Sequence, residues 1–260
     1  MSAEPIRHQR SEGEILLAMG PLGLRRLREA HSAKLRIPAG SHEAILINTG
    51  GGLAGGDRFR FAITAEENAG LTVTSQAAER VYRSLGPAAD VEISLKAEAS
   101  ATLMWLPQET ILFDGAALTR RITADLGPDA RFLAVESVIL GREAMGETVR
   151  SARLHDSWRI RQQGRLIFAD DIAFDGLPPN GKATLGEARA FATVVLVSPR
   201  AEDVLDKARS LIGHRGSASA WGGKLVARLA ARDGFELRKS LIPALTLLAD
   251  GASLPKTWSF

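Results

Sequence analysis

The stretch Ala44-Ile45-Leu46-Ile47-Asn48-Thr49-Gly50-Gly51-Gly52-Leu53-Ala54-Gly55-Gly56-Asp57-Arg58-Phe59-Arg60-Phe61-Ala62-Ile63 decides how this chain folds. Five of the seven residues from Gly50 to Gly56 are glycine, a density kept where the backbone needs positive φ or where another group comes close. The apolar run before the loop predicts a buried strand, and the strict alternation after it predicts a half-buried one. We therefore expect strand, glycine loop and strand, with Asp57 at the loop exit. A long β-connection without a ligand is the commoner explanation of such a loop.

The glycine loop contains the spacing GxGxxG, which in dinucleotide-binding proteins joins a strand to a helix. The segment behind this loop alternates with a period of two, so no helix N-terminus is present to hold a pyrophosphate. The spacing therefore predicts a structural loop rather than a nucleotide site. Its members are Gly50, Gly51, Gly52, Gly55 and Gly56.

Composition limits the class of protein further. The chain has 260 residues and no cysteine, which excludes disulfides and thiolate ligands and suits a reducing compartment. The net charge is only +3, both signs are interspersed and aromatic residues make up 5%, so a nucleic-acid groove is not expected. The sequence shows neither a signal-peptide core nor a membrane span. We expect one cytoplasmic domain over residues 1–260, with residues 1–12 flexible.

Period-two alternation recurs through the first three quarters of the chain without intervening helical patterns. This arrangement argues against a βαβ sheet and favours a sandwich, a barrel or stacked sheets. Helices are expected mainly in the C-terminal third, from Ser198-Pro199 to Gly213 and along the stripe from Leu237 to Leu248, where Pro243 interrupts the pattern. The predicted strands include residues 71–74, 91–97, 102–106, 132–135, 158–161, 165–168, 190–197 and 224–230.

Catalytic signatures are absent from the sequence. The five histidines lie far apart with no zinc spacing, and no GxSxG is present. Several carboxylates stand beside glycine or proline turns, and each has an ordinary explanation as a turn cap, an ion pair or a solvated group. Taken together they could handle a cation by oxygen ligation, which is weak and exchangeable. The candidates are Asp57, Glu79, Glu109, Asp114, Glu143 and Glu147.

Five segments, in this order, resemble the urease accessory protein family UreD, also called UreH, and the resemblance extends over nearly the whole chain. They are Gly-Gly-Gly-Leu-Ala-Gly-Gly-Asp at 50–57, Gln-Ala-Ala-Glu-Arg-Val-Tyr-Arg at 76–83, Leu-Pro-Gln-Glu-Thr-Ile-Leu-Phe-Asp-Gly-Ala at 106–116, Gly-Arg-Glu-Ala-Met-Gly-Glu at 141–147 and Pro-Lys-Thr-Trp at 255–258.

The resemblance implies a mainly β protein, a β-helix-like stack of many strands with a few helices. It also implies a non-enzymatic maturation factor that binds urease apoprotein and, with the helical protein UreF and the GTPase UreG, supports nickel insertion. No tightly bound cofactor is implied, only transient nickel along a polar passage that the six carboxylates would line. The chain departs from many relatives where Gly20-Pro21-Leu22 leads into Arg25-Arg26-Leu27-Arg28, and in having no cysteine before the glycine loop.

Two other classes of function remain open from the residues alone. One is a β-rich hydrolase or sugar-processing enzyme that uses two of the carboxylates as general acid and base. The other is a plain binding module whose glycine loop holds a ligand. The absence of any local catalytic signature favours the maturation factor over the enzyme.

Overall fold

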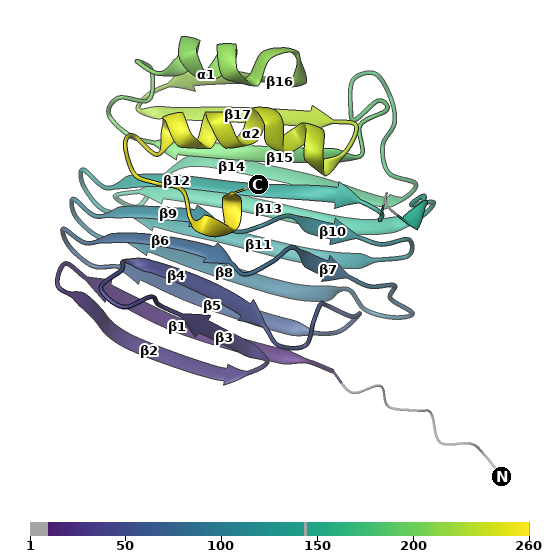
Figure 1. Cartoon of the computed structure of the whole chain (residues 1–260), viewed down its shortest axis with the longest axis horizontal. Coiled ribbons are helices and arrows are strands. Elements are labelled where there is room, and N and C mark those ends of the chain that lie inside the picture. The colour runs from purple at the N-terminus through teal and green to yellow at the C-terminus, as the bar shows by residue number, and fades with distance from the viewer. Residues whose placement is uncertain (1–9, 143–144, 260) are drawn as a thin grey trace.

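The chain forms two β-sheets stacked face to face, with two helices at one end of the stack (Figure 1). The computed structural model describes residues 10–142 and 145–259. The strands of the first sheet run in the order β14-β13-β11-β8-β5-β1-β2. The second sheet runs β16-β17-β15-β12-β9-β6-β4-β3, and the short strands β7 and β10 extend it beside β12.

The bounds of the elements follow the alternating segments of the sequence closely. The strands of the first sheet are β1 (Glu12–Gly20), β2 (Gly23–His31), β5 (Arg58–Ala65), β8 (Ala89–Ala97), β11 (Ala117–Leu126), β13 (Ala152–Gln162) and β14 (Arg165–Gly176). Those of the second are β3 (Ala33–Arg36), β4 (Glu43–Asn48), β6 (Gly70–Ser75), β7 (Glu79–Val81), β9 (Thr102–Leu106), β10 (Thr110–Leu112), β12 (Arg131–Leu140), β15 (Ala190–Val197), β16 (Gly216–Trp221) and β17 (Lys224–Ala231). The helices are α1 (Leu205–Ile212) and α2 (Gly234–Leu248).

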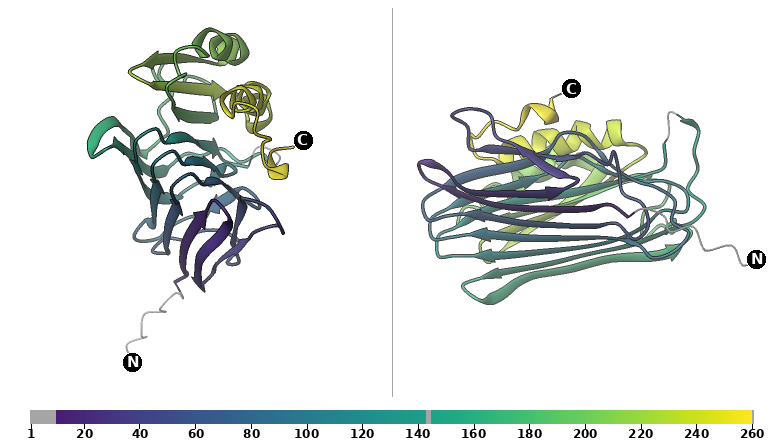
Figure 2. Two further views of the ribbon diagram at one scale, coloured as in Figure 1. Left: turned by 90° about the vertical axis from the view of Figure 1, so that its left-hand side faces the viewer. Right: turned by 90° about the horizontal axis from the view of Figure 1, so that it is seen from below.

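From β4 to β13 the chain coils, passing back and forth between the two sheets. Strands that follow one another in the same sheet are parallel, as in the pairs β5 with β8, β8 with β11 and β11 with β13. Parallel sheets usually need crossover helices, whereas here each strand of one sheet is the crossover for the other. The expected β-helix-like stack is confirmed, and Figure 2 shows the two sheets end-on.

The core lies between the sheets and is filled by the inward-facing side chains of the alternating strands. In β5, Phe59 is buried while Arg58 and Arg60 are exposed, so the expected half-buried strand is confirmed. The two-residue turn between β13 and β14 is a tight hairpin, because Gln163 and Gly164 have φ of 49° and 78°, the positive values that such a turn needs.

The C-terminal part closes one end of the stack. β15, β17 and β16 continue the second sheet in antiparallel order, and α2 packs its apolar stripe on β15 and β17. α2 runs through Pro243. The predicted start of the first helix at Ser198 is wrong, because α1 begins only at Leu205. Before it the chain forms a separate turn, in which the Ala201 N–H donates to the Ser198 carbonyl and Ala201 is buried. Among the described helices, none has the length and apolar content to cross a membrane.

Candidate functional site

The second sheet is interrupted in two successive coils. β6 ends at Ser75 and resumes as β7 at Glu79, and β9 ends at Leu106 and resumes as β10 at Thr110. Segments 76–78 and 107–109, which we call the strand break, lie beside each other because β6 pairs with β9 and β7 pairs with β10. Pro107 lacks a backbone N–H and suits such a gap in the ladder. β12 crosses the same level unbroken.

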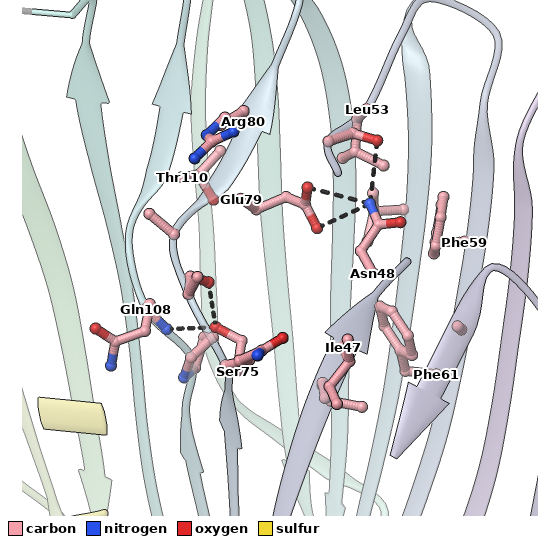
Figure 3. Close-up of a pocket in the computed structure, with 18 of the residues that line it drawn as sticks. Ile47, Asn48, Leu53, Phe59, Phe61, Ser75, Glu79, Arg80, Gln108 and Thr110 are labelled. Atoms are coloured by element: carbon pink, nitrogen blue, oxygen red, sulfur yellow. Dashed lines mark hydrogen bonds between the residues drawn. The ribbon is translucent and has the colours of Figure 1, made fainter. Parts of the chain in front are cut away.

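A cavity of about 280 Å³ opens at the strand break and extends between the sheets. Gln76 and Ala77 are exposed at this opening, and the interior wall is largely apolar, formed by side chains such as Phe59, Phe61 and Ile93. Figure 3 shows the polar side chains at the opening, where the Ser75 hydroxyl accepts a hydrogen bond from the Gln108 backbone N–H at 2.9 Å. The interior of the sandwich is therefore reachable through its second sheet.

Glu79 is the candidate carboxylate that lines this cavity (Figure 3). Its two oxygens accept from the Asn48 side-chain amide at 3.2 and 3.3 Å, and Asn48 also donates to the Gly52 carbonyl. Burial raises the pKa of Glu79 from 4.5 to about 7, and the hydrogen bond from Asn48 offsets only part of that effect. Near neutral pH this group therefore exchanges a proton easily. The charge of Arg80 favours its ionised form, but Glu79 makes no ion pair with a described residue.

A buried ionic cluster forms the inner end of the cavity. Arg120 donates to Asp156 at 2.5 and 3.1 Å, to the Thr110 hydroxyl at 3.0 Å and to Glu136. The Trp105 indole donates to Glu136 at 2.8 Å. Burial opposes the charge of Arg120, but Asp156 and Glu136 outweigh it and raise its pKa. Burial, reinforced by Asp156, raises the pKa of Glu136, because two carboxylates share one guanidinium.

The glycine loop supports the wall of the cavity through close packing. Gly52 has φ of +148°, and a Cβ there would lie 2.4 Å from the Tyr82 ring and 2.8 Å from the Arg80 carbonyl. A Cβ on Gly55 would lie 1.9 Å from the Ser84 hydroxyl oxygen. Asp57 is buried, and its oxygens accept from the backbone N–H groups of Ser11 at 2.7 Å and Ala54 at 2.8 Å. Asp57 therefore closes the loop onto the start of β1.

Glu109 is turned toward helix α2 rather than into the cavity. It is buried and accepts from Arg238 at 2.6 and 2.9 Å, which raises the pKa of Arg238. The C-terminal segment lies against the same place: Trp258 donates to the Leu106 carbonyl at 2.9 Å, and the Thr257 hydroxyl lies 3.0 Å from that of Thr74. Helix α2 and the C-terminal segment thus hold one side of the strand break.

Asp114 and Glu147 meet in a second, open pocket of about 710 Å³. Arg83 lies 2.9 Å from Asp114, and Arg142 lies 3.0 Å from Glu147. Hydrogen bonds from the backbone of Arg150 and Ser151 lower the pKa of Asp114, and that from the Arg142 side chain lowers the pKa of Glu147. Both carboxylates are ionised and already satisfied. Glu143 lies outside the described residues.

The sequence reasoning missed the buried cluster, although a signal for it exists. Arg120 stands between Leu118 and Ile122 in β11, and Asp156 stands between Leu154 and Trp158 in β13, each at an inward position of the alternation. Glu136 is a charged residue within the buried run of β12. A charged residue at an inward strand position indicates a paired interior group, and this rule would have found all three.

The arrangement offers oxygen and amide ligands without a closed metal cage. In the described part of the chain, no three side chains of His, Cys, Asp or Glu are grouped so that they could hold a metal ion. At Glu79 the neighbouring polar groups are the Asn48 amide N–H₂, which faces the carboxylate, and the Gly52 carbonyl, while the Asn48 oxygen accepts from the Gly50 N–H.

Comparison with known proteins shows similarity over nearly the whole chain. Residues 9–259 match the family model described as UreD urease accessory protein. The urease accessory protein UreD of Rhizobium leguminosarum bv. viciae is 47% identical over 268 residues, covering 99% of this chain and 98% of the relative. The protein of the same name from Rhizobium etli is 48% identical over the same shares. That from Agrobacterium fabrum is 44% identical, covering 98% of this chain and 94% of the relative.

Proposed function

Because this chain belongs to the UreD family of urease accessory proteins, we propose that it binds urease apoprotein and admits nickel through the cavity at the strand break on the way to the urease active site. The proposal includes the partners of a maturation assembly, a UreF-like helical protein and a UreG-like GTPase, and a place in the cytoplasm. The protein acts as a scaffold and conduit and not as an enzyme.

The environment of Glu79 is the observation that supports the role of conduit. Its carboxylate faces the cavity, its side-chain hydrogen bonds come from the neutral amide of Asn48, and burial raises its pKa to about 7. A divalent cation entering the cavity displaces the proton and gains a carboxylate oxygen, and protonation releases the cation again. The wall beyond is largely apolar, and the carboxylates of Glu136 and Asp156 are held by Arg120, so few free ligands compete for the cation.

The other candidate carboxylates have different tasks in this proposal. Asp57 and Glu109 hold the glycine loop and helix α2, and Asp114 and Glu147 are neutralised by arginines. The hydrolase alternative gains no support, because these groups are engaged by arginine or by backbone N–H donors. Asp114 and Glu147 share the open pocket, but each is already paired with an arginine.

Urease maturation with Glu79 variants tests the proposal. Urease matured with Glu79→Gln or Glu79→Ala should contain less nickel and show lower activity, while a pull-down shows normal assembly with the urease apoprotein. Asp125→Asn, an exposed carboxylate on β11, is the matched control and should behave as wild type. Normal nickel content in urease matured with both Glu79 variants would refute the conduit role. Failure of the wild-type chain to bind urease apoprotein would remove the scaffold as well.

A further inference from the structure

The strand β2 leaves one complete edge of the first sheet without a partner. β2 pairs with β1 on one side, and no described strand pairs with its other side. It lies at the end of the stack opposite the helices, and beyond it Figure 1 shows no other labelled element. Along nine residues, alternate N–H and C=O groups of such a strand point outward and are available to another strand.

The side chains of β2 are unusual for a solvated edge. Leu24 and Leu27 are 49% and 38% exposed although they lie opposite Met19 and Leu17, which are fully buried. They therefore face the core side, at the open end of the sandwich. Leu22, in the turn before β2, is 93% exposed. Exposed apolar side chains beside unpaired backbone groups indicate a surface that another chain covers.

The outer face of β2 is basic. Arg26 lies opposite Ala18 and Arg28 opposite Leu16, on the face away from the core. Arg28 and Arg25 have loose partners, each 3.5 Å from a glutamate. The Arg26 side chain makes no hydrogen bond or ion pair with any residue that the structure describes. In a strand added beside β2, the side chains on the core side would lie beside Leu24 and Leu27, and those on the outer side would lie beside the unpaired Arg26.

We propose that β2 accepts an extended segment of a partner protein as an added strand, with apolar side chains on the inner face and acidic side chains on the outer face. A second copy of this chain fits poorly as the added strand. If two β2 strands paired antiparallel with Arg26, Leu27 or Arg28 at the centre, an arginine would lie opposite another arginine or opposite no acidic residue. The acidic edge strand β14 fits poorly as well, because its Asp170 and Asp171 already pair with Arg228 and Arg159. This inference does not depend on the passage of nickel.

A fluorescent ten-residue peptide of alternating valine and glutamate, titrated into the full chain and followed by anisotropy, tests the proposal. Binding should saturate and weaken as salt is added. Arg26→Glu should weaken it about fivefold or more, since a favourable cross-strand pair becomes a like-charge pair. Arg58→Glu is the matched control: it is an exposed, outward-facing arginine on interior strand β5, and it should leave the affinity unchanged.

Hydrogen exchange locates the bound peptide. Residues 23–31 should become protected on binding, and the exposed residues Gln76 and Ala77 at the strand break should not. Equal affinity for a peptide with lysine in place of glutamate, absence of protection in β2, or no saturable binding would overturn the proposal. Self-association of the chain that protects β2 without peptide, and that Arg26→Glu abolishes, would identify a second copy as the occupant and would also overturn it.

Discussion

Replacing Glu79 by glutamine should change how the stability of this protein depends on pH. The pKa of Glu79 is raised from 4.5 to about 7 by burial, so the folded protein holds this proton more tightly than the unfolded chain does. The stabilisation that this proton gives is complete below pH 4.5 and is lost as the pH rises from 4.5 through 7. A pKa difference of one pH unit between the folded and unfolded states changes the free energy of unfolding by about 1.4 kcal/mol. At pH 8 the free energy of unfolding is therefore lower by about 3 kcal/mol.

Glutamine keeps the size of the side chain and an oxygen that accepts from Asn48, but it carries no proton to lose. Glu79→Gln should therefore match wild type at pH 4.5 and exceed it by up to about 3 kcal/mol at pH 8. Urea unfolding at several pH values between 4.5 and 8, for wild type, Glu79→Gln and the control Asp125→Asn, measures the difference. Glu136 contributes a dependence of the same sign to all three proteins, so the comparison isolates Glu79. Parallel curves for wild type and Glu79→Gln would refute the reasoning.

Further predictions concern the loop, helix α2 and the behaviour of the isolated chain. Asp57→Asn places an amide N–H₂ where two backbone N–H groups need acceptors, and should lower stability by about 2 kcal/mol in thermal melts. Gly52→Val should cost about 3 kcal/mol or more, because its Cβ would overlap a tyrosine ring and a carbonyl, whereas Gly51→Asn, with φ of +73° and open space, should change the melting temperature little. Arg238→Met leaves the buried carboxylate of Glu109 without its cation and should cost about 3 kcal/mol, with Glu109→Gln in the same background restoring part of it. Expressed alone the chain should be poorly soluble, and co-expression with a UreF-like partner should improve the yield; an unchanged yield of monodisperse protein would count against a scaffold.

Much of the strand pattern could be predicted from local rules. Alternation in Arg58–Ile63 and the continuous apolar run Ala190–Val197 indicated strands that the structure confirms, because side-chain period and burial are local properties of a strand. The start of α1 could not be predicted in this way. The turn that buries Ala201 depends on contacts with the sheet, and these override the helix-start signal at Ser198.

The sequence by itself determined the mainly β architecture, the tight conformation of the glycine loop and the absence of thiolate chemistry, since these depend on residue types and on spacing along the chain. Only the tertiary structure decided which carboxylates face a cavity. Glu79 lines the cavity while Glu109 turns away to Arg238, although both follow a strand-breaking turn, because α2 supplies a cation on one side only. The cluster of Arg120, Glu136 and Asp156 likewise exists only because β11 and β13 pair Arg120 with Asp156 and β12 of the facing sheet brings Glu136 against them. Residues far apart in sequence come within hydrogen-bonding distance through strand pairing, and that pairing is set by the packing of the whole stack.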